Sequence, residues 1–465
     1  MKVLLLSPPF LPYYMRNARC DFVSLSGTQW YPILLGYCGA WLEKCGHDVM
    51  FIDAPSYNLD RDAVEKTAIK YKPDYMVVYT GRLSEDNDIE IADTLTEQLG
   101  CETVIVGPYA SINPEGILKK SRSVTMVIAG EFEFPVQEIA DKKPLKDVCN
   151  LVYKEGGEIV RNRERPYLTT EQLDLIPVVS GFFKKHLDVY RYKTPSEYYP
   201  FIDILTGRGC KWGKCTYCLW VNTWIKGPTY NLRSVDNVIE EFQFIKKELP
   251  QIRSVMIQDD TFTEGHALEF SEAKIKSQND LKWSCYARGN MSYEILKTMK
   301  KAGCRNLHVG YESAAPGILT AIKKGLTREQ MTSFTKDAKM AGLRIHGDFA
   351  FGFPGETAET CRETIQWAKE LNPHTAQFQL MIPFPGTPFY NLLKEKGWLT
   401  ENGEPDYPDF SNEDIRLWAK KAYRQFYLSF QYLQKALMHP YEHFWVRLET
   451  ISKAIPAMFW QKWRV

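Results

Sequence analysis

The chain has 465 residues, which is too long for one ordinary hydrophobic core and predicts two or three domains. Its 58 Lys and Arg balance 57 Asp and Glu, so no basic surface for nucleic acid is expected. No apolar run approaches the ~20 residues that cross a bilayer. Eleven scattered cysteines argue against a disulfide framework and predict a reducing, cytoplasmic location.

Strand-like and helix-like segments alternate over residues 1–145. Apolar runs such as 3–7 and 75–79 are separated by helical patterns such as 31–45 and 86–99. This rhythm predicts a doubly wound, Rossmann-like parallel sheet with a ligand at the carboxyl ends of its strands. Several residues expected there are glycines, which allow a large flat ligand to approach the backbone. The expected strand-end residues are Pro9, Thr80, Gly81, Arg82, Gly107, Tyr109, Gly130 and Glu131.

Residues 146–195 are polar and interrupted by prolines, and we interpret them as a connector. Three cysteines, Cys210, Cys215 and Cys218, then lie within nine residues, directly after an apolar run. Three thiolates suit a [4Fe–4S] cluster with one iron open to a substrate or cofactor. Other interpretations stay open: a zinc site, a thioredoxin-like pair of Cys215 and Cys218, or three buried structural thiols.

Segment 206–220 resembles the cluster loop of the radical S-adenosylmethionine (SAM) superfamily, in which an aromatic residue precedes the last cysteine, as Tyr217 does here. The family usually has three residues between the first two cysteines, whereas this chain has four, including Gly213. Between residues 196 and 395, six strand-like runs with intervening helices resemble the family's partial (β/α)6 barrel.

Beside such a barrel, residues 1–145 are similar to the cobalamin-binding domain of one large subgroup of this superfamily. Segments 104–115 and 127–131 carry the resemblance through their glycine-bearing strand ends. The resemblance implies that the eight strand-end residues contact cobalamin. The loop after the first strand contains no histidine, so we predict that no histidine ligates cobalt. Arg82 is the candidate for the lower face of the corrin, and a solvated loop arginine is the alternative.

The resemblance also implies a [4Fe–4S] cluster on the three cysteines and a SAM site at the barrel mouth. SAM must chelate the open iron through its amine and carboxylate, which calls for a carboxylate near the first and a cation near the second. We assign Glu312 to the amine or the ribose and Arg288 to the carboxylate. Salt bridges at the barrel mouth are the alternative for each charged residue. The full set expected at SAM is Tyr217, Asp259, Arg288, Glu312, Gly352 and Pro354.

Residues 396–465 are expected to form helices over the barrel mouth, one or two at 412–439 and another at 444–463. The second is rich in Trp and carries Lys and Arg, so contact with a membrane surface is an alternative to packing. No cysteine lies beyond Cys361, so no auxiliary cluster is expected.

The resemblance thus implies an enzyme that transfers a methyl group from SAM, through methylcobalamin, to an unactivated carbon or a phosphorus. It would use a 5′-deoxyadenosyl radical and an electron donor such as flavodoxin or ferredoxin. A small molecule, a lipid or a peptide could be the substrate. A non-methylating cobalamin reaction, such as cyclisation, ring contraction or carbon–carbon coupling, is the first alternative. A non-catalytic corrinoid or redox sensor is the second.

Overall fold

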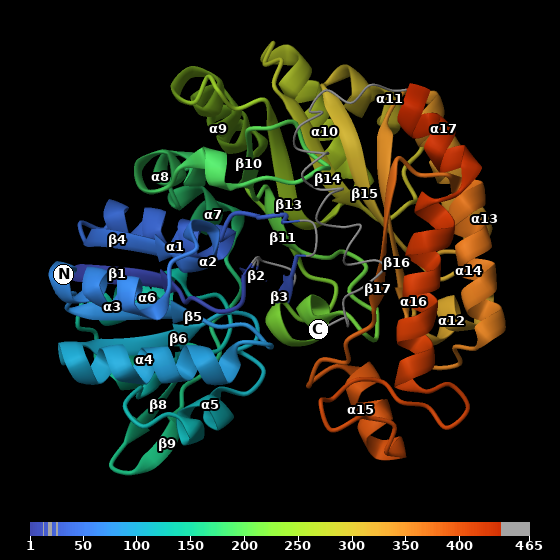
Figure 1. Cartoon of the computed structure of the whole chain (residues 1–465). Helices are drawn as coiled ribbons and strands as arrows, with labels where there is room; N and C mark the ends of the chain where they lie inside the picture. The colour runs from blue at the N-terminus through green and yellow to red at the C-terminus, as the bar shows by residue number, and fades with distance from the viewer. Residues whose placement is uncertain (13, 17–20, 25–26, 439–465) are drawn as a thin grey trace.

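The structure is a computed structural model that describes residues 1–12, 14–16, 21–24 and 27–438. Two sheets dominate it and lie side by side, with β11 (Gly207–Gly209) and the small β2–β3 hairpin (Tyr14–Arg16, Asp21–Val23) between them (Figure 1). The expected α/β class, a doubly wound sheet followed by a partial barrel, is confirmed.

The N-terminal sheet has seven strands, of which the first five in the sheet order are parallel. Their order is typical of a doubly wound fold, in which the chain reverses direction next to the first strand. From one edge to the other, the strands are β4 (Asp48–Asp53), β1 (Lys2–Ser7), β5 (Tyr75–Tyr79), β6 (Glu102–Val106), β7 (Met126–Ile128), β8 (Leu151–Glu155) and β9 (Glu158–Arg161).

Both faces of this sheet are buried because alternate residues of each strand enter separate cores. Val3 and Leu5 pack in one core, and Leu4 and Leu6 pack in the other. Helices α1 (Ile33–Lys44) and α6 (Glu133–Ala140) cover the first face. The helices on the second face are α3 (Arg61–Tyr71), α4 (Glu85–Leu99) and α5 (Pro114–Lys120), with the short α2 (Ala54–Tyr57) at its edge.

The segment expected to be a connector contains regular structure that we did not predict. Strands β8 and β9 form an antiparallel hairpin that extends the N-terminal sheet beyond β7. Helices α7 (Thr170–Leu175) and α8 (Val179–His186) follow, and α8 packs on α1. Residues 151–161 therefore belong structurally to the first sheet.

The second sheet is a six-stranded, all-parallel half-barrel in sequence order. Its strands are β10 (Phe201–Ile204), β13 (Ser254–Phe262), β14 (Lys282–Ala287), β15 (Cys304–Glu312), β16 (Arg344–Phe351) and β17 (Thr375–Leu380). The helices between them are α9 (Val235–Glu248), α10 (Glu264–Lys276), α11 (Tyr293–Lys301), α12 (Pro316–Ala321), α13 (Arg328–Met340) and α14 (Ala358–Leu371). β11 pairs with β12 (Tyr230–Leu232) between β10 and α9.

The two sheets share one core along the free edge of β10. The Tyr37 hydroxyl accepts a hydrogen bond from the Leu205 amide at 2.9 Å, and Tyr31 binds Asp203 and the Phe201 carbonyl. These contacts cover strand-edge groups that would otherwise be unpaired. Helix α1 and the residues just before it therefore fix the N-terminal domain against the first strand of the half-barrel.

After the half-barrel come α15 (Pro388–Lys396), α16 (Asn412–Tyr427) and α17 (Phe430–Met438). α16 packs on β17, where the Tyr427 hydroxyl bonds the backbone of Ala376. The expected helix at 444–463 and its membrane contact lie outside the described residues. Among the described helices, none is both long and apolar enough to cross a bilayer.

Candidate functional site

The three cysteines lie on a loop between β11 and a short π-helical turn at Trp220–Trp224. All three are half-buried free thiols. Gly213, at φ +58°, allows this loop to pass the backbone of Gly227, since a Cβ on Gly213 would lie 2.3 Å from it. The extra residue in the first gap is accommodated at this left-handed position. Asn222 then donates hydrogen bonds to the carbonyls of Cys215 and Cys218, which fixes the loop.

The spacing of the thiols fits a cluster better than a single zinc ion. Burial is the main cause that raises the pKa of Cys215 and of Cys218, and the charges of the neighbouring thiols add to the rise, so the three sulfurs share one neighbourhood. A zinc ion with Zn–S bonds of ~2.3 Å would hold sulfurs about 3.8 Å apart. Among the described residues, one group of three metal-ligating side chains has its ligand atoms within 4.8 Å of one another, and the three cysteines are not in it. The thiols are therefore more widely spaced than one zinc ion requires.

A cation and a carboxylate lie beside Cys215. Lys324 Nζ is 2.9 Å from Glu312 Oε1 in a buried ion pair. Arg288 donates to the Lys324 carbonyl at 2.6 Å and lies over the Trp212 ring at 4.8 Å. Burial raises the pKa of Cys215, and the positive charges of Lys324 and Arg288 oppose this rise. The cations thus stabilise the thiolate form that an iron cluster requires.

Sequence reasoning missed Lys324, which lies in the loop after α12. That loop packs against the cysteine loop: Trp212 donates to the Lys323 carbonyl at 2.8 Å, and Thr216 donates to the Ile322 carbonyl at 3.1 Å. Gly325 has no side chain and so leaves room for the Trp212 ring. The Lys-Lys-Gly sequence was the available signal, because a glycine next to a cation often marks a closely packed binding loop.

Asp259, expected at SAM, holds the backbone beneath the cysteine loop. It is buried and accepts hydrogen bonds from the Thr206 amide at 2.7 Å, the Thr206 hydroxyl and the Gly207 amide at 3.0 Å. Burial raises its pKa to about 7. A SAM contact by Asp259 stays a prediction, and the observed contacts make it a positioning residue for Thr206 and Gly207.

The turn after β16 lies next to Tyr217, whose ring meets Phe353 edge-on at 5.2 Å. Gly352 adopts φ +103°, and the buried Glu356 accepts a hydrogen bond from its amide at 2.9 Å. Pro354, in the same turn, is half-buried. Tyr217, Arg288, Glu312 and this turn therefore lie around Cys215, and their contacts with SAM stay predictions.

At the carboxyl ends of the N-terminal strands, a buried ion pair holds two strand-end loops together. Arg16 binds Asp88 at 2.6 Å with both side chains fully buried, and Arg16 also donates to the Pro8 carbonyl. Asp88 in turn accepts from Thr80 and Gly81. The side chain of Thr80 is therefore used within the protein.

The remaining strand-end residues are small or half-buried. Gly107 and Gly130 have φ of +122° and +123°, which only glycine adopts readily, and Ser111 links the two by hydrogen bonds of 2.9 Å. Tyr109 and Arg82 are half-buried, and Arg82 Nε has no hydrogen-bond partner among the described residues. Pro9 accepts a hydrogen bond from Asn87 through its carbonyl. The contacts of all eight residues with cobalamin stay predictions.

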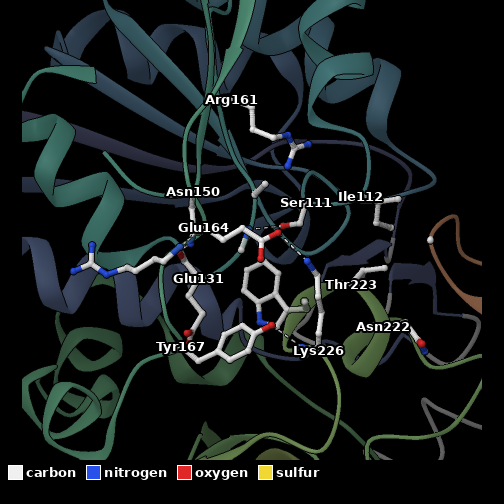
Figure 2. Close-up of a pocket in the computed structure, with 15 residues that line it drawn as sticks. Ser111, Ile112, Glu131, Asn150, Arg161, Glu164, Tyr167, Asn222, Thr223 and Lys226 are labelled. Atoms are coloured by element: carbon white, nitrogen blue, oxygen red, sulfur yellow. Dashed lines mark hydrogen bonds and ion pairs between the residues drawn. The ribbon is translucent and has the colours of Figure 1, made fainter. Parts of the chain in front are cut away.

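A cavity of about 240 Å³ lies between the N-terminal sheet and the turn that follows the cysteine loop (Figure 2). Gly130 and Glu131 line it from the N-terminal sheet, and Trp224 and Lys226 line it from the cysteine side. Lys226 and Glu164 form an ion pair of 2.8 Å across it. The cavity therefore joins the end of β7 to the turn after Cys218.

A buried ion triad connects the same two regions. Arg208, two residues before Cys210, binds Glu131 Oε1 at 2.8 Å and Glu133 Oε1 at 2.5 Å. All three side chains are at most 6% exposed, and Glu131 also accepts from the Leu168 amide. The triad fixes the position of the cysteine loop relative to the end of β7.

Comparison with known proteins agrees with this geometry. The Radical SAM superfamily model matches residues 204–368, which span the cysteine loop and the half-barrel through most of α14. An uncharacterized methyltransferase of Pyrococcus horikoshii is 30% identical over 480 residues and covers 99% of both chains. The chain belongs to the cobalamin-dependent radical SAM methyltransferase-like family. It is an enzyme of this family, as expected.

Two more distant relatives of this radical SAM enzyme carry different names. The anaerobic magnesium-protoporphyrin IX monomethyl ester cyclase of Rubrivivax gelatinosus is 23% identical, over 93% of this chain and 79% of its own. The cytidylyl-2-hydroxyethylphosphonate methyltransferase of Streptomyces wedmorensis is 26% identical, over 85% and 81%.

Two solved structures share the whole fold. The radical SAM methyltransferase TsrM of Kitasatospora setae has a TM-score of 0.67 at 19% identity, covering 85% of this chain and 76% of its own. The cobalamin-dependent SAM radical enzyme OxsB has a TM-score of 0.68 at 14% identity, covering 98% and 70%. At such identities these structures support the architecture alone.

Proposed function

We propose that this radical SAM enzyme transfers a methyl group from SAM, by way of cobalamin, to an unactivated carbon or a phosphorus of a small-molecule substrate. The observation that carries the proposal is the set of three half-buried thiols beside Glu312, Lys324 and Arg288. When bound, the reduced cluster supplies the electron that cleaves SAM, and cobalamin supplies the methyl group.

The residues of the chain bind and orient these groups. Cys210, Cys215 and Cys218 would hold the cluster, with the half-buried loop limiting its contact with water. The carboxylate of Glu312 and the cations beside it match the amine and carboxylate of a zwitterionic amino acid. Because these charges are held in place before SAM arrives, less freedom is lost on binding.

Cobalamin binding is proposed for the edge of the N-terminal sheet. Gly107 and Gly130 carry no side chain at the ends of β6 and β7, and Gly130 lines the cavity between this edge and the cysteine side, which suits a large, amide-rich ring. The relatives named as methyltransferases favour methyl transfer. The cyclase relative favours the second candidate, a cobalamin reaction without methyl transfer.

Anaerobic reconstitution with iron, sulfide and cobalamin, followed by SAM and a reductant, tests the proposal. Reduced flavodoxin or ferredoxin serves as the reductant, with dithionite as the comparison. We expect both 5′-deoxyadenosine and S-adenosylhomocysteine by mass spectrometry. Deoxyadenosine without S-adenosylhomocysteine would support the second candidate, and zinc in place of iron would contradict both.

A further inference from the structure

The interior of the half-barrel carries polar side chains below the proposed SAM site. Strand register places Tyr286, His308, His346 and Thr375 in one row across four neighbouring strands, β14 to β17. Asp348 lies one row nearer the carboxyl end, opposite Gly310. Side chains of alternate residues on a strand point to the same face, so His346 and Asp348 project together. None of these residues was singled out as a ligand site from the sequence.

Two imidazoles of this row and the carboxylate of the next row converge. The ligand atoms of His308, His346 and Asp348 all lie within 4.8 Å of one another. His346 Nε2 is 3.3 Å from Asp348 Oδ1. Two ligands on a tetrahedral metal ion, each with a bond of ~2.0–2.1 Å, lie about 3.3–3.4 Å apart. The His346 to Asp348 distance therefore already equals one edge of such a site.

We propose that His308, His346 and Asp348 form a binding site for a divalent transition-metal ion, Zn²⁺ or Fe²⁺, inside the half-barrel. Imidazole nitrogen and carboxylate oxygen are ligands that both ions accept, and two histidines with one carboxylate are a recurrent set. This site is separate from the cysteine loop, and on metal binding His308 would move inward to supply the third ligand.

Residues behind the histidines support the ligand role. Thr375 Oγ1 lies 2.7 Å from His346 Nδ1, which leaves Nε2 directed at Asp348. Behind His308, Glu197 Oε1 lies 4.0 Å from Nε2, and Glu197 is itself held by Ser254 and Ser284. A hydrogen bond such as that of Thr375 orients a metal-bound histidine. At 4.0 Å, Glu197 acts on His308 through its charge and not through a hydrogen bond. Arg305 lies 3.9 Å from Glu197, so its positive charge is paired there.

The site has an open side toward the proposed SAM site. His346 and Asp348 retain 17% and 21% of their side-chain exposure although they lie on an inner strand. Gly310 provides no side chain above His308, and Glu312 Oε1 would be 2.5 Å from a Cβ placed on Gly310. Three protein ligands leave at least one coordination position free.

If the proposed function holds, an anionic oxygen of the substrate fills that position, which places the substrate beneath Glu312. Metal binding itself does not depend on the proposed function.

The test uses the holoenzyme with its iron–sulfur cluster assembled, treated with a chelator and then given one equivalent of Zn²⁺. After desalting, zinc and iron per chain are measured by mass spectrometry. The wild type is expected to retain about one zinc per chain, as one three-ligand site would. Asp348→Asn and His346→Ala are expected to bind zinc at least tenfold more weakly, with unchanged iron content. His186→Gln, outside the half-barrel interior, is the matched control and should retain zinc.

A wild type that retains less than a tenth of an equivalent of zinc overturns the inference. So does an Asp348→Asn variant that retains as much zinc as the wild type. Because Asn has nearly the shape of Asp, unchanged iron content and circular dichroism separate loss of the ligand from loss of the fold. Deoxyadenosine is measured in the same samples: its absence contradicts the proposed function without affecting the zinc result.

Discussion

The carboxyl ends of the parallel strands offer a ligand different groups in the two sheets. At the N-terminal edge, charged side chains bind one another: Arg16 pairs with Asp88, and Glu131 pairs with Arg208. Glycines and backbone make up much of the rest. At the barrel edge, half-buried thiols lie beside an ion pair that a zwitterion can join. The first edge suits a large ligand recognised by shape, and the second suits a small ligand recognised by charge.

The largest effect is expected from removing one thiol at the barrel edge, which tests whether the two edges bind their ligands independently. Cys215→Ala is expected to abolish both the iron–sulfur absorbance and SAM cleavage, because two thiolates cannot hold the cluster. Cobalamin content should be unchanged if the two edges bind independently. Absorption spectra, iron content and deoxyadenosine formation provide the measurements. Cys149→Ala, a half-buried cysteine elsewhere, is the matched control. Cleavage that survives in Cys215→Ala would refute the cluster assignment.

The connection between the edges is tested at Arg208. Arg208→Met would leave Glu131 and Glu133 buried without their cation, which costs about 3–5 kcal/mol for a buried pair. We expect a clear drop in the thermal unfolding midpoint. Arg161→Met removes a half-exposed pair with Glu115 and should cost about 0–1 kcal/mol. Equal midpoints for the two variants would show that the triad contributes little.

Recognition by charge is tested at Lys324. Lys324→Ala leaves Glu312 buried without its cation and removes a positive charge from the position proposed for the SAM carboxylate. A charged hydrogen bond is worth about 1.5–3 kcal/mol, so SAM should bind roughly tenfold to hundredfold more weakly. Equilibrium binding of SAM to the reconstituted enzyme measures this. The adjacent, exposed Lys323 gives the control Lys323→Ala. Unchanged affinity in Lys324→Ala would contradict the assignment.

Much of the architecture followed from the sequence because apolar periodicity is local. Segment 75–79 was predicted with the bounds that the structure has. The β8–β9 hairpin was missed because its strands are short, and β9 is polar and half-exposed.

The site was predictable where a motif marks it, as the cysteines do. Lys324 was missed because tertiary packing, not spacing, brings its loop to Cys215. Asp259 was expected after a strand, whereas β13 continues to Phe262, and sequence does not indicate toward which neighbour a carboxylate turns. In the structure, it turns to Thr206 and Gly207.

The smallest expected effect concerns Glu356, whose buried carboxyl holds the Gly352 turn at the barrel edge. Burial raises the pKa of Glu356 from 4.5 to about 7, although the Gly352 amide bonds it. As pH rises from about 4.5 to 7, the unfolded chain releases this proton before the folded chain does. Stability from this group is therefore lost across that window and levels off above pH 7.

Glu356→Gln carries no proton to lose, so its thermal midpoint should fall less than that of the wild type between pH 5 and pH 8. The difference corresponds to about 1–3 kcal/mol, from 1.36 kcal/mol per pKa unit. Glu359→Gln changes an exposed glutamate of the next helix and should keep the wild-type pH slope. If Glu356→Gln keeps it too, the carboxyl is ionised in the folded state, and the Gly352 turn is held by charge. The barrel edge would then use charge at the turn beside Tyr217 as well as at the ion pair of Glu312, unlike the N-terminal edge.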